Sequence, residues 1–409
     1  MGDKLRLGIV GLGNRGQGLL ETCIIPEESV EVCSVCDLLE ERRSRTLAMF
    51  KAAGKNLPKT AEHYREILAD EDVDAVIFTT SWESHINLAC EAMRAGKYAA
   101  IEVGGAYSVE DCWKLVRTHE ETGVHCMFLE NCCYGRTELM VANMVRQGVL
   151  GEIVHCRGGY MHDIRDEIAF GRENNHYRFR NYLSRNAENY PTHQLGPISR
   201  ILQINRGNRM LSLVSVASKA SGLHAFFDRE RGEAYDATHW NFKQGDIVST
   251  VIKCAGGETI ALTLDTTLPR PYSRDFQVHG TKGMYSEESN SFFLDGVDDE
   301  FHENWQKRWN NAEEYREKYD HPLWRNYSER GGHGGMDWLV LQDFFSAAKK
   351  NLPAPIDVYD AAAWMSITCL SEQSISTGGM PVAIPDFTNG MWLRSAPPDF
   401  GADSNLTID

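Results

Sequence analysis

A glycine-rich turn near the N-terminus constrains the fold more than any other feature of the chain. The apolar run LRLGIVGLG leads into Gly11, Gly13 and Gly16, and a helical pattern, RGQGLLETCII, follows. In a strand–turn–helix unit, the first glycine allows a tight turn and the second lets a pyrophosphate approach the backbone. The third lets the helix pack on the strand. The start of the helix, at Asn14 and Arg15, then faces the phosphates, so these residues are predicted to bind a dinucleotide.

An acidic residue at the end of the second expected strand supports this interpretation. Asp37 follows the run VEVCSVC and lies about 20 residues beyond Gly16, where a carboxylate binds a ribose 2′-hydroxyl. A carboxylate there would repel a 2′-phosphate, so NAD is favoured over NADP, although Arg42 and Arg43 leave NADP as an alternative. An ordinary glycine-rich turn is the competing interpretation, and the combination of strand, turn, helix and acid favours the NAD site.

The pattern of apolar runs divides the chain into two parts. Residues 1–131 alternate short apolar strands with helices, which predicts a Rossmann NAD-binding domain with a doubly wound parallel sheet. Residues 132–409 contain longer alternating segments joined by glycine turns, which predicts an α+β substrate-binding domain with an open, mostly antiparallel sheet. Within it, residues 300–330 are charged and rich in Trp and Tyr, and we expect an ordered loop or lid there.

Charge and hydropathy exclude several classes of partner. Lys and Arg number 42 against 58 Asp and Glu, a formal net charge of −16, so binding to nucleic acid or to an anionic membrane surface is not expected. No run of about 20 apolar residues predicts a transmembrane helix, and the N-terminal segment lacks the features of a signal peptide.

The 11 cysteines are scattered through apolar runs, which is typical of reduced thiols in a cytoplasmic protein. Cys33 and Cys36 form a Cys-x-x-Cys pair, but strand alternation would place them on opposite faces. Cys132 and Cys133 have no second pair at metal-ligand spacing nearby. We therefore predict no metal site.

Further motifs carry a resemblance to a known family. The glycine turn, TTSWESH (79–85) and GKYAAIEVGGA (96–106) resemble the Gfo/Idh/MocA oxidoreductases, which pair a Rossmann domain with a C-terminal α/β domain. Ordinary members carry Glu-Lys-Pro after the fifth strand, and that lysine is central to their dehydrogenase chemistry. Here the tripeptide is Glu102-Val103-Gly104, so the lysine is absent.

The motifs that differ from those of ordinary members resemble one branch of that superfamily, glycoside hydrolase family 109, the NAD-dependent α-N-acetylgalactosaminidases. The resemblance covers roughly residues 5–390 and is carried by LENCCY (129–134), GGYMHD (158–163), YRFRNYLSRNAENYPTHQLGP (177–197), RPYS (270–273), HGTKG (279–283) and GGHGGMD (331–337). It implies a glycosidase with tightly bound, recycled NAD and a small-molecule glycoside as substrate, such as an N-acetylgalactosaminide. By analogy with the superfamily, it also implies a homodimer or homotetramer.

The chemistry implied by this resemblance needs particular groups. Oxidation of a sugar at C3 makes the neighbouring C2–H acidic, so that a base can remove it and the C1–O bond can break by elimination. Water then adds to the enone, and C3 is reduced again. Such an enzyme needs a base for the 3-hydroxyl, a base for C2–H and help for the leaving oxygen, but not the paired carboxylates of other glycosidases.

Four residues are candidates for this proton chemistry. His193, in Asn189-Tyr-Pro-Thr-His193, is the first candidate for the base at the 3-hydroxyl, with capping of the following helix as the alternative. By resemblance, Tyr160 is the C2 base, provided that positive charge or hydrogen bonds lower the pKa of its phenol. His162 would share a strand face with Tyr160 and could substitute for it. Glu130 would bind sugar hydroxyls or tune His193, or would only cap the next helix.

The resemblance also assigns Arg178, Tyr190 and Tyr272 to the substrate, each with a packing or solvent-exposed role as the alternative. Trp82, His85 and Glu102 are expected beside the cofactor, together with the glycine turn and Asp37. His333, between two pairs of glycines, is expected to reach the substrate, or else only leads into the following helix. A net NAD-dependent sugar or inositol dehydrogenase is the competing function, and the absent lysine speaks against it. A non-catalytic NAD-binding sensor is the third hypothesis, and the cluster of Tyr and His residues speaks against that.

Overall fold

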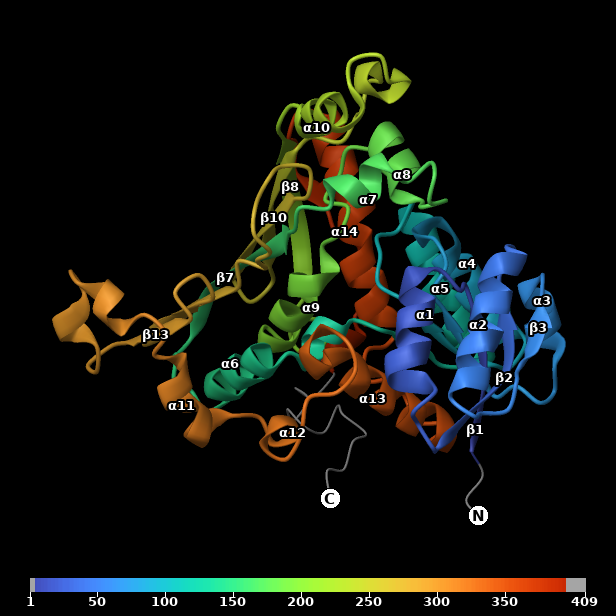
Figure 1. Ribbon diagram of the computed structural model, residues 1–409. Coiled ribbons are helices and arrows are strands. Elements are labelled where there is room, and N and C mark those ends of the chain that lie inside the picture. Colours follow the sequence, from blue (N-terminus) through green and yellow to red (C-terminus); the bar gives the residue numbers. More distant parts are fainter. Residues whose placement is uncertain (1–3, 395–409) are drawn as a thin grey trace.

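The computed structural model describes residues 4–394, which form two sheets flanked by helices (Figure 1). The first sheet has six parallel strands in the order β3-β2-β1-β4-β5-β6. Its strands are β1 (Leu5–Val10), β2 (Val30–Cys36), β3 (Lys59–Ala61), β4 (Ala75–Phe78), β5 (Tyr98–Ile101) and β6 (Cys126–Phe128). The strand order reverses between β1 and β4, and ligands bind at the carboxyl edge beside such a reversal.

Five α-helices connect these strands and confirm the predicted Rossmann fold. They are α1 (Asn14–Leu19), α2 (Glu40–Ala52), α3 (Tyr64–Ala69), α4 (Trp82–Arg94) and α5 (Val109–Thr122), and α1 continues into a π-helical turn, η1 (Leu20–Ile24). Strands β4, β5 and β6 are wholly buried because helices cover both faces of the sheet.

The second sheet has eight strands in the order β13-β12-β11-β7-β10-β9-β8-β14. All neighbouring pairs are antiparallel except β7 and β10, so the sheet is mostly antiparallel, as predicted. Its strands are β7 (Ile153–Met161), β8 (Met210–Ala217), β9 (Ile247–Cys254), β10 (Thr259–Asp265), β11 (Gln277–Gly280), β12 (Gly283–Ser286), β13 (Ser291–Leu294) and β14 (Val382–Ala383).

Helices cover one face of this sheet and the edge between the two domains. They are α6 (Arg136–Arg146), α7 (Arg165–Ala169), α8 (Arg178–Ser184), α9 (Thr192–Ile201), α10 (Gly222–Arg231), α13 (Met336–Lys350) and α14 (Val358–Ser376). α9 packs against β7 and α14 packs against β8. The opposite face leaves apolar side chains in solvent, with Val216 55% and Val251 52% exposed.

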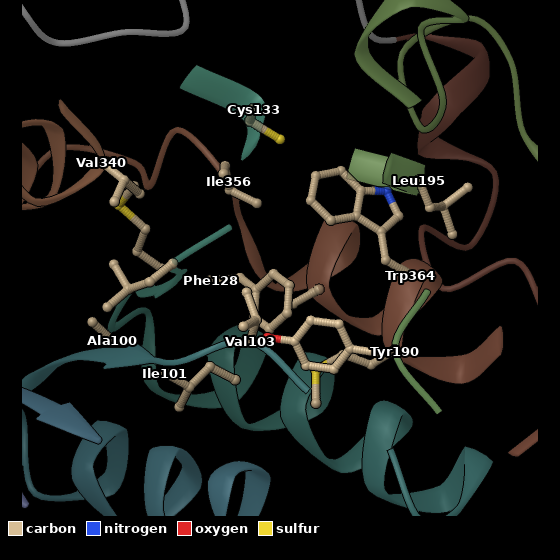
Figure 2. Close-up of a cluster of buried hydrophobic side chains, with 14 of the residues drawn as sticks. Ala100, Ile101, Val103, Phe128, Cys133, Tyr190, Leu195, Val340, Ile356 and Trp364 are labelled. Atoms are coloured by element: carbon tan, nitrogen blue, oxygen red, sulfur yellow. The ribbon is translucent and has the colours of Figure 1, made fainter. Parts of the chain in front are cut away.

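The central helix α14 joins the two sheets. It contacts α5 on one side and β8 on the other, and it is buried around most of its circumference. Figure 2 shows the adjoining core, where Trp364 of α14 lies near Leu195 of α9 and Phe128 of β6. Tyr190 lies in the same cluster, so the loop before α9 is anchored in the core between the domains.

The segment expected as a loop or lid, residues 300–330, holds short helices. They are η4 (Asp299–Phe301), η5 (Trp305–Arg308), α11 (Ala312–Tyr319) and α12 (Pro322–Arg325). Trp324 is buried, and its Nε1 donates a hydrogen bond of 2.9 Å to the carbonyl of Tyr134. Arg136 of α6 pairs with Asp320 at 2.6 Å. This segment therefore packs on α6, and a lid function stays a prediction.

Among residues 4–394, no helix combines the length and the apolar character that a bilayer-spanning helix needs.

Candidate active site

The glycine turn has the geometry that a dinucleotide requires. Gly11 adopts a φ of +97°, which favours glycine, and a Cβ on Gly16 would lie 2.2 Å from the carbonyl oxygen of Gly11. A Cβ on Gly13 would meet only Arg42 Nη1, at 3.7 Å, so the backbone is open on that side. Asn14 begins α1, whose N-terminus therefore adjoins this open backbone. The residues present fit a pyrophosphate.

Asp37 is buried beside this turn. Its Oδ2 accepts a hydrogen bond of 2.7 Å from the Leu12 amide, and its Oδ1 accepts one of 2.9 Å from the Leu39 amide. Arg42 Nη1 lies 3.5 Å from Oδ2. Each carboxylate oxygen keeps a further lone pair for a ribose hydroxyl, so Asp37 fits the predicted role as well as fixing the turn.

Arg15 ties the turn to the C-terminal part of the chain. Its Nη1 and Nη2 pair with the two oxygens of Asp337 at 2.7 and 2.9 Å, and its Nε pairs with Glu102 at 2.8 Å. His333 Nδ1 lies 2.8 Å from Asp337 Oδ2, and Asn131 donates to Oδ1 at 2.8 Å. Although burial opposes the charge, the bonds from His333 and Arg15 hold the pKa of Asp337 well below its usual value.

The close packing of α9 brings His193 to Glu130. A Cβ on Gly196 would lie 2.9 Å from Cys133 Sγ and 3.0 Å from Glu130 Cγ, so a larger residue here would push these side chains away. His193 Nδ1 lies 2.7 Å from Glu130 Oε1, which also accepts the Cys132 amide at 3.1 Å. Burial opposes ionisation of Glu130, but His193 holds the pKa of this carboxyl below its usual value. Glu130 thus both caps the short helix η2 (Asn131–Tyr134) and contacts His193.

Tyr160 and His162 form a second pair, at the end of β7. The Tyr160 hydroxyl lies 3.0 Å from His162 Nδ1. Burial raises the pKa of Tyr160, and the nearby Arg178 opposes this rise without overcoming it. Burial also lowers the pKa of His162, so that its ring is neutral at pH 7. The phenol is therefore protonated in this state, contrary to the lowered pKa that its role as a base would favour.

An aromatic cluster joins the two pairs. The ring centroid of Tyr160 lies 4.4 Å from that of Tyr190 and 5.5 Å from that of His193. Arg178 places its guanidinium 5.3 Å from the ring centroids of both Trp82 and Tyr190. Residues from α4, β7, α8 and the start of α9 therefore meet at one point between the two domains.

The remaining predicted residues lie at different depths. Tyr272 is 51% exposed, and its ring centroid is 5.1 Å from that of His162. His333 is largely exposed, on a turn with four glycines. His85 is buried within α4, its Nε2 lies 2.9 Å from the Thr80 carbonyl, and burial lowers its pKa to about 4. Its contact with a cofactor stays a prediction, as does the ligand-binding role of each other residue.

Two residues of the hydrogen-bond network around Arg15 were absent from the sequence-based predictions. Asp337 holds Arg15, His333 and Asn131 together, and it follows His333 by four residues, the spacing of neighbours on one helical face. That spacing within GGHGGMD was the available signal. No sequence signal indicates Asn131, because its partner is 206 residues away.

Comparisons with known proteins place this site in a family. The family described as glycosyl hydrolase 109, C-terminal domain, matches residues 134–394, and the oxidoreductase family with NAD-binding Rossmann fold matches residues 5–129. An α-N-acetylgalactosaminidase of Tannerella forsythia is 37% identical over 96% of this chain and 88% of its own length. A glycosyl hydrolase family 109 protein of Stenotrophomonas maltophilia is 38% identical over 97% and 92%, respectively.

The chain belongs to glycosyl hydrolase family 109. It is therefore an enzyme of a glycosidase family that carries an NAD-binding Rossmann domain, and the predicted family and fold class are confirmed.

Solved structures support the fold. A levoglucosan dehydrogenase in complex with NADH and levoglucosan has a TM-score of 0.69 at 18% identity, over 94% of this chain and all of the other. A myo-inositol 2-dehydrogenase from Lactobacillus plantarum has a TM-score of 0.66 at 14% identity, with the same coverage. At these identities, the similarity shows a shared fold only.

Proposed function

We propose that this glycosidase cleaves N-acetylgalactosaminides or related glycosides by transient oxidation at C3, with NAD that stays bound between turnovers. One observation carries the proposal: two hydrogen-bonded pairs, His193–Glu130 and Tyr160–His162, lie against each other at the point where the domains meet. Two proton transfers at neighbouring sugar carbons need two such groups. The name of the Tannerella relative supports the choice of substrate.

His193 is the base for the sugar 3-hydroxyl. Because Glu130 is ionised, it accepts the Nδ1 proton of a neutral imidazole, which leaves Nε2 free to take a proton. The carboxylate also stabilises the imidazolium that forms, as in other His–carboxylate pairs. Bound NAD supplies the hydride acceptor for C3 and returns the hydride at the end of the cycle.

Tyr160 and His162 remove the proton at C2 as a unit. The raised pKa of Tyr160 means that the phenol oxygen must lose its own proton before it can accept another. His162 Nδ1, at 3.0 Å, is placed to take that proton when the imidazole is neutral. Arg178 stabilises negative charge on the phenol, and Tyr190 and Tyr272 border the sugar together with Arg178.

The ion pairs of Arg15 support retention of the cofactor. Asp337 and Glu102 are 235 positions apart in the sequence and hold the same guanidinium, close in sequence to the open backbone of Gly13. A dinucleotide that occupies the turn would have to disturb this network in order to leave. His333, fixed by Asp337 on its glycine-rich turn, is proposed to contact the substrate from the C-terminal side.

A simple experiment separates this function from a net dehydrogenase. Purified protein is expected to contain NAD and to cleave a nitrophenyl N-acetylgalactosaminide without added cofactor. In D2O the released sugar should carry deuterium at C2. Stoichiometric reduction of added NAD by a free sugar or inositol would instead establish a dehydrogenase, and a product without deuterium at C2 would exclude the elimination.

We also propose that the protein works in the cytoplasm as a homodimer or homotetramer. All eleven cysteines lie within residues 4–394 and none is in a disulfide, which supports a reducing compartment. The open face of the second sheet, with Val216 and Val251 in solvent, supports self-association. Sedimentation of the holoenzyme tests the assembly state, and a monomer at micromolar concentration would exclude it.

A further inference from the structure

A third ligand-type side chain lies beside the His193–Glu130 pair. Cys132 offers its sulfur, Glu130 a carboxylate oxygen and His193 a ring nitrogen, and these three atoms all lie within 4.8 Å of one another. All three side chains are buried. Sequence spacing cannot indicate this group, because His193 is separated from Glu130 by 63 positions and is brought to it by the packing of α9 on η2.

Glu130 has unused capacity to bind a cation. Its carboxylate is fully buried, and Oε2 has no partner at hydrogen-bond geometry among the described residues, although the Thr192 hydroxyl is close enough to help lower the pKa of this carboxyl. Oε1 accepts the bonds from both His193 and Cys132. A buried carboxylate oxygen without a hydrogen-bond partner is costly, so a cation at this place would be stabilised.

The three atoms match the preference of one class of metal ion. Zn²⁺ binds thiolate at about 2.3 Å, imidazole at about 2.0–2.1 Å and carboxylate at about 2.0–2.2 Å, commonly with three protein ligands and an open fourth position. One carboxylate and one thiolate would balance its two charges. Pair separations of at most 4.8 Å are within reach of such a site after side-chain rotations.

We propose that Glu130, Cys132 and His193 bind a thiophilic divalent cation, Zn²⁺, and that the bound ion stops catalysis through Nδ1 of His193. The inhibitory half of this proposal rests on the proposed function, whereas the binding half does not. On binding, the Cys132 thiol releases its proton to water and the sulfur donates an electron pair to the metal.

The inhibition follows from the tautomer of His193. In the proposed mechanism of the metal-free enzyme, Nδ1 donates its proton to Glu130, 2.7 Å away, and Nε2 is the acceptor. A metal ion bound at Nδ1 takes the lone pair of that nitrogen, and the single proton of the neutral ring must then reside on Nε2. Nε2 can no longer accept the proton of the 3-hydroxyl. The ion therefore removes the base by fixing the ring in the tautomer that cannot accept the proton.

Binding is tested with Co²⁺ as a spectroscopic probe of the NAD-loaded holoenzyme. The unmodified protein should bind one Co²⁺ and show a thiolate-to-cobalt charge-transfer band, which Zn²⁺ abolishes by displacement. Cys132→Ser should lose the band and weaken Zn²⁺ binding by at least about 100-fold, because loss of a group that only supports a metal ligand already costs about 10–100-fold. Cys133→Ser is the matched control: Cys133 is buried on the same short helix but lies outside the cluster, so the band should persist.

His193→Ala serves as a second variant if Cys132→Ser does not fold, as judged by circular dichroism and NAD content. It should keep the thiolate band but bind Co²⁺ more weakly. A holoenzyme that binds no Co²⁺, or a band unchanged in Cys132→Ser, would overturn the proposal.

Inhibition is tested on glycoside cleavage. Micromolar Zn²⁺ should inhibit the unmodified enzyme and Cys133→Ser, and a chelator should restore both. Equal inhibition of Cys132→Ser would overturn the inhibitory half. A protein that shows the cobalt band but cleaves no glycoside would refute the proposed function and leave the binding site intact.

Discussion

Replacing Glu130 by Gln tests the central pair of the site with the smallest structural change. The amide keeps the shape of the carboxylate and removes only its charge. Because Oε1 accepts hydrogen bonds from both the Cys132 amide and His193, the amide oxygen of the new side chain should take that position. His193 would then keep its tautomer, and only the stabilisation of its charged form would be lost.

The size of the effect follows from this geometry. A hydrogen bond to a charged group contributes about 1.5–3 kcal/mol, which corresponds to a loss of roughly 10- to 150-fold in rate. Substitutions that force the wrong tautomer of a catalytic histidine cost about 10⁴-fold, and we expect a smaller loss here because the oxygen stays in place. The new amide NH₂ would occupy the buried position of Oε2, which makes no hydrogen bond with the described residues. Burying this donor without a partner would lower the free energy of unfolding by about 1–3 kcal/mol.

The assay is a single turnover of NAD-loaded enzyme with a glycoside, followed by the absorbance of the reduced nicotinamide. Its rise reports oxidation at C3, the step in which His193 acts, and separates this step from elimination. Glu188→Gln is the matched control. Glu188 is also fully buried, it has no hydrogen-bond partner on either carboxylate oxygen among the described residues, and burial raises its pKa to about 8. It is already protonated at pH 7, so its amide should leave the rate near native.

Oxidation at the native rate in Glu130→Gln would refute the role of the carboxylate. A loss above about 10⁴-fold would refute the argument that the tautomer is preserved, because it would match the penalty for a wrongly protonated imidazole. An equal loss in Glu188→Gln would indicate a general disturbance of the core.

Three further predictions follow. Asp37→Asn keeps an oxygen for the Leu12 amide but loses charge-assisted hydrogen bonds to ribose. The purified variant should therefore retain at least about tenfold less NAD, with an unchanged fold. A native NAD content would exclude Asp37 as the ribose ligand. Tyr160→Phe should accumulate reduced cofactor and a 3-keto glycoside in one turnover, and normal turnover would contradict its role. Burial lowers the pKa of His85 and of His321 to about 4, so the unfolded chain binds more protons below pH 6.5 and stability falls as the pH drops. At pH 5 each histidine should lower the free energy of unfolding by about 2 kcal/mol. His321→Asn keeps an acceptor for the Leu323 amide at the helix start and should recover the part due to His321, as measured by urea unfolding. Equal acid sensitivity of this variant would show that His321 is not responsible.

The first domain could be predicted because its signals are local. A strand, a glycine turn and a helix stand next to each other in the sequence, and β4, β5 and β6 are short runs buried on both faces. β3, with three residues, and α3, with six, were not predicted, because elements so short show too few turns or alternations for a periodicity to emerge.

The segment 300–330 could not be predicted from its own pattern. α11 and α12 together have few buried residues, and their positions depend on contacts with other elements, such as the bond from Trp324 to Tyr134. The charged surface of these helices therefore resembles a loop in the sequence. Tertiary contacts determine the structure here, and no periodicity within the segment encodes them.

The contacts of the candidate site also fall into two groups, those that local sequence patterns predict and those that depend on tertiary packing. Tyr160 lies in β7 and His162 follows the last residue of that strand, so their pairing follows from continued strand alternation. His193 meets Glu130 because α9 packs on η2, with Gly196 at the contact, and no local rule indicates that approach. The network of Arg15 and Asp337 spans 322 positions and was invisible for the same reason.

The structure shows what surrounds the position at which ordinary members of the superfamily carry a lysine. Val103 occupies its position, and a Cβ on the next residue, Gly104, would lie 2.5 Å from Cδ1 of Trp82. Trp82 therefore takes the space that a proline at 104 would need, and Val103→Lys alone would not restore the dehydrogenase arrangement. Positive charge comes instead from Arg178 of the second domain, above Trp82 and Tyr190. A guanidinium does not release its proton near neutral pH, so Arg178 stabilises charge without exchanging protons. In the proposed mechanism, the proton transfers are therefore left to His193 and to Tyr160, one at each of two neighbouring carbons, as elimination requires.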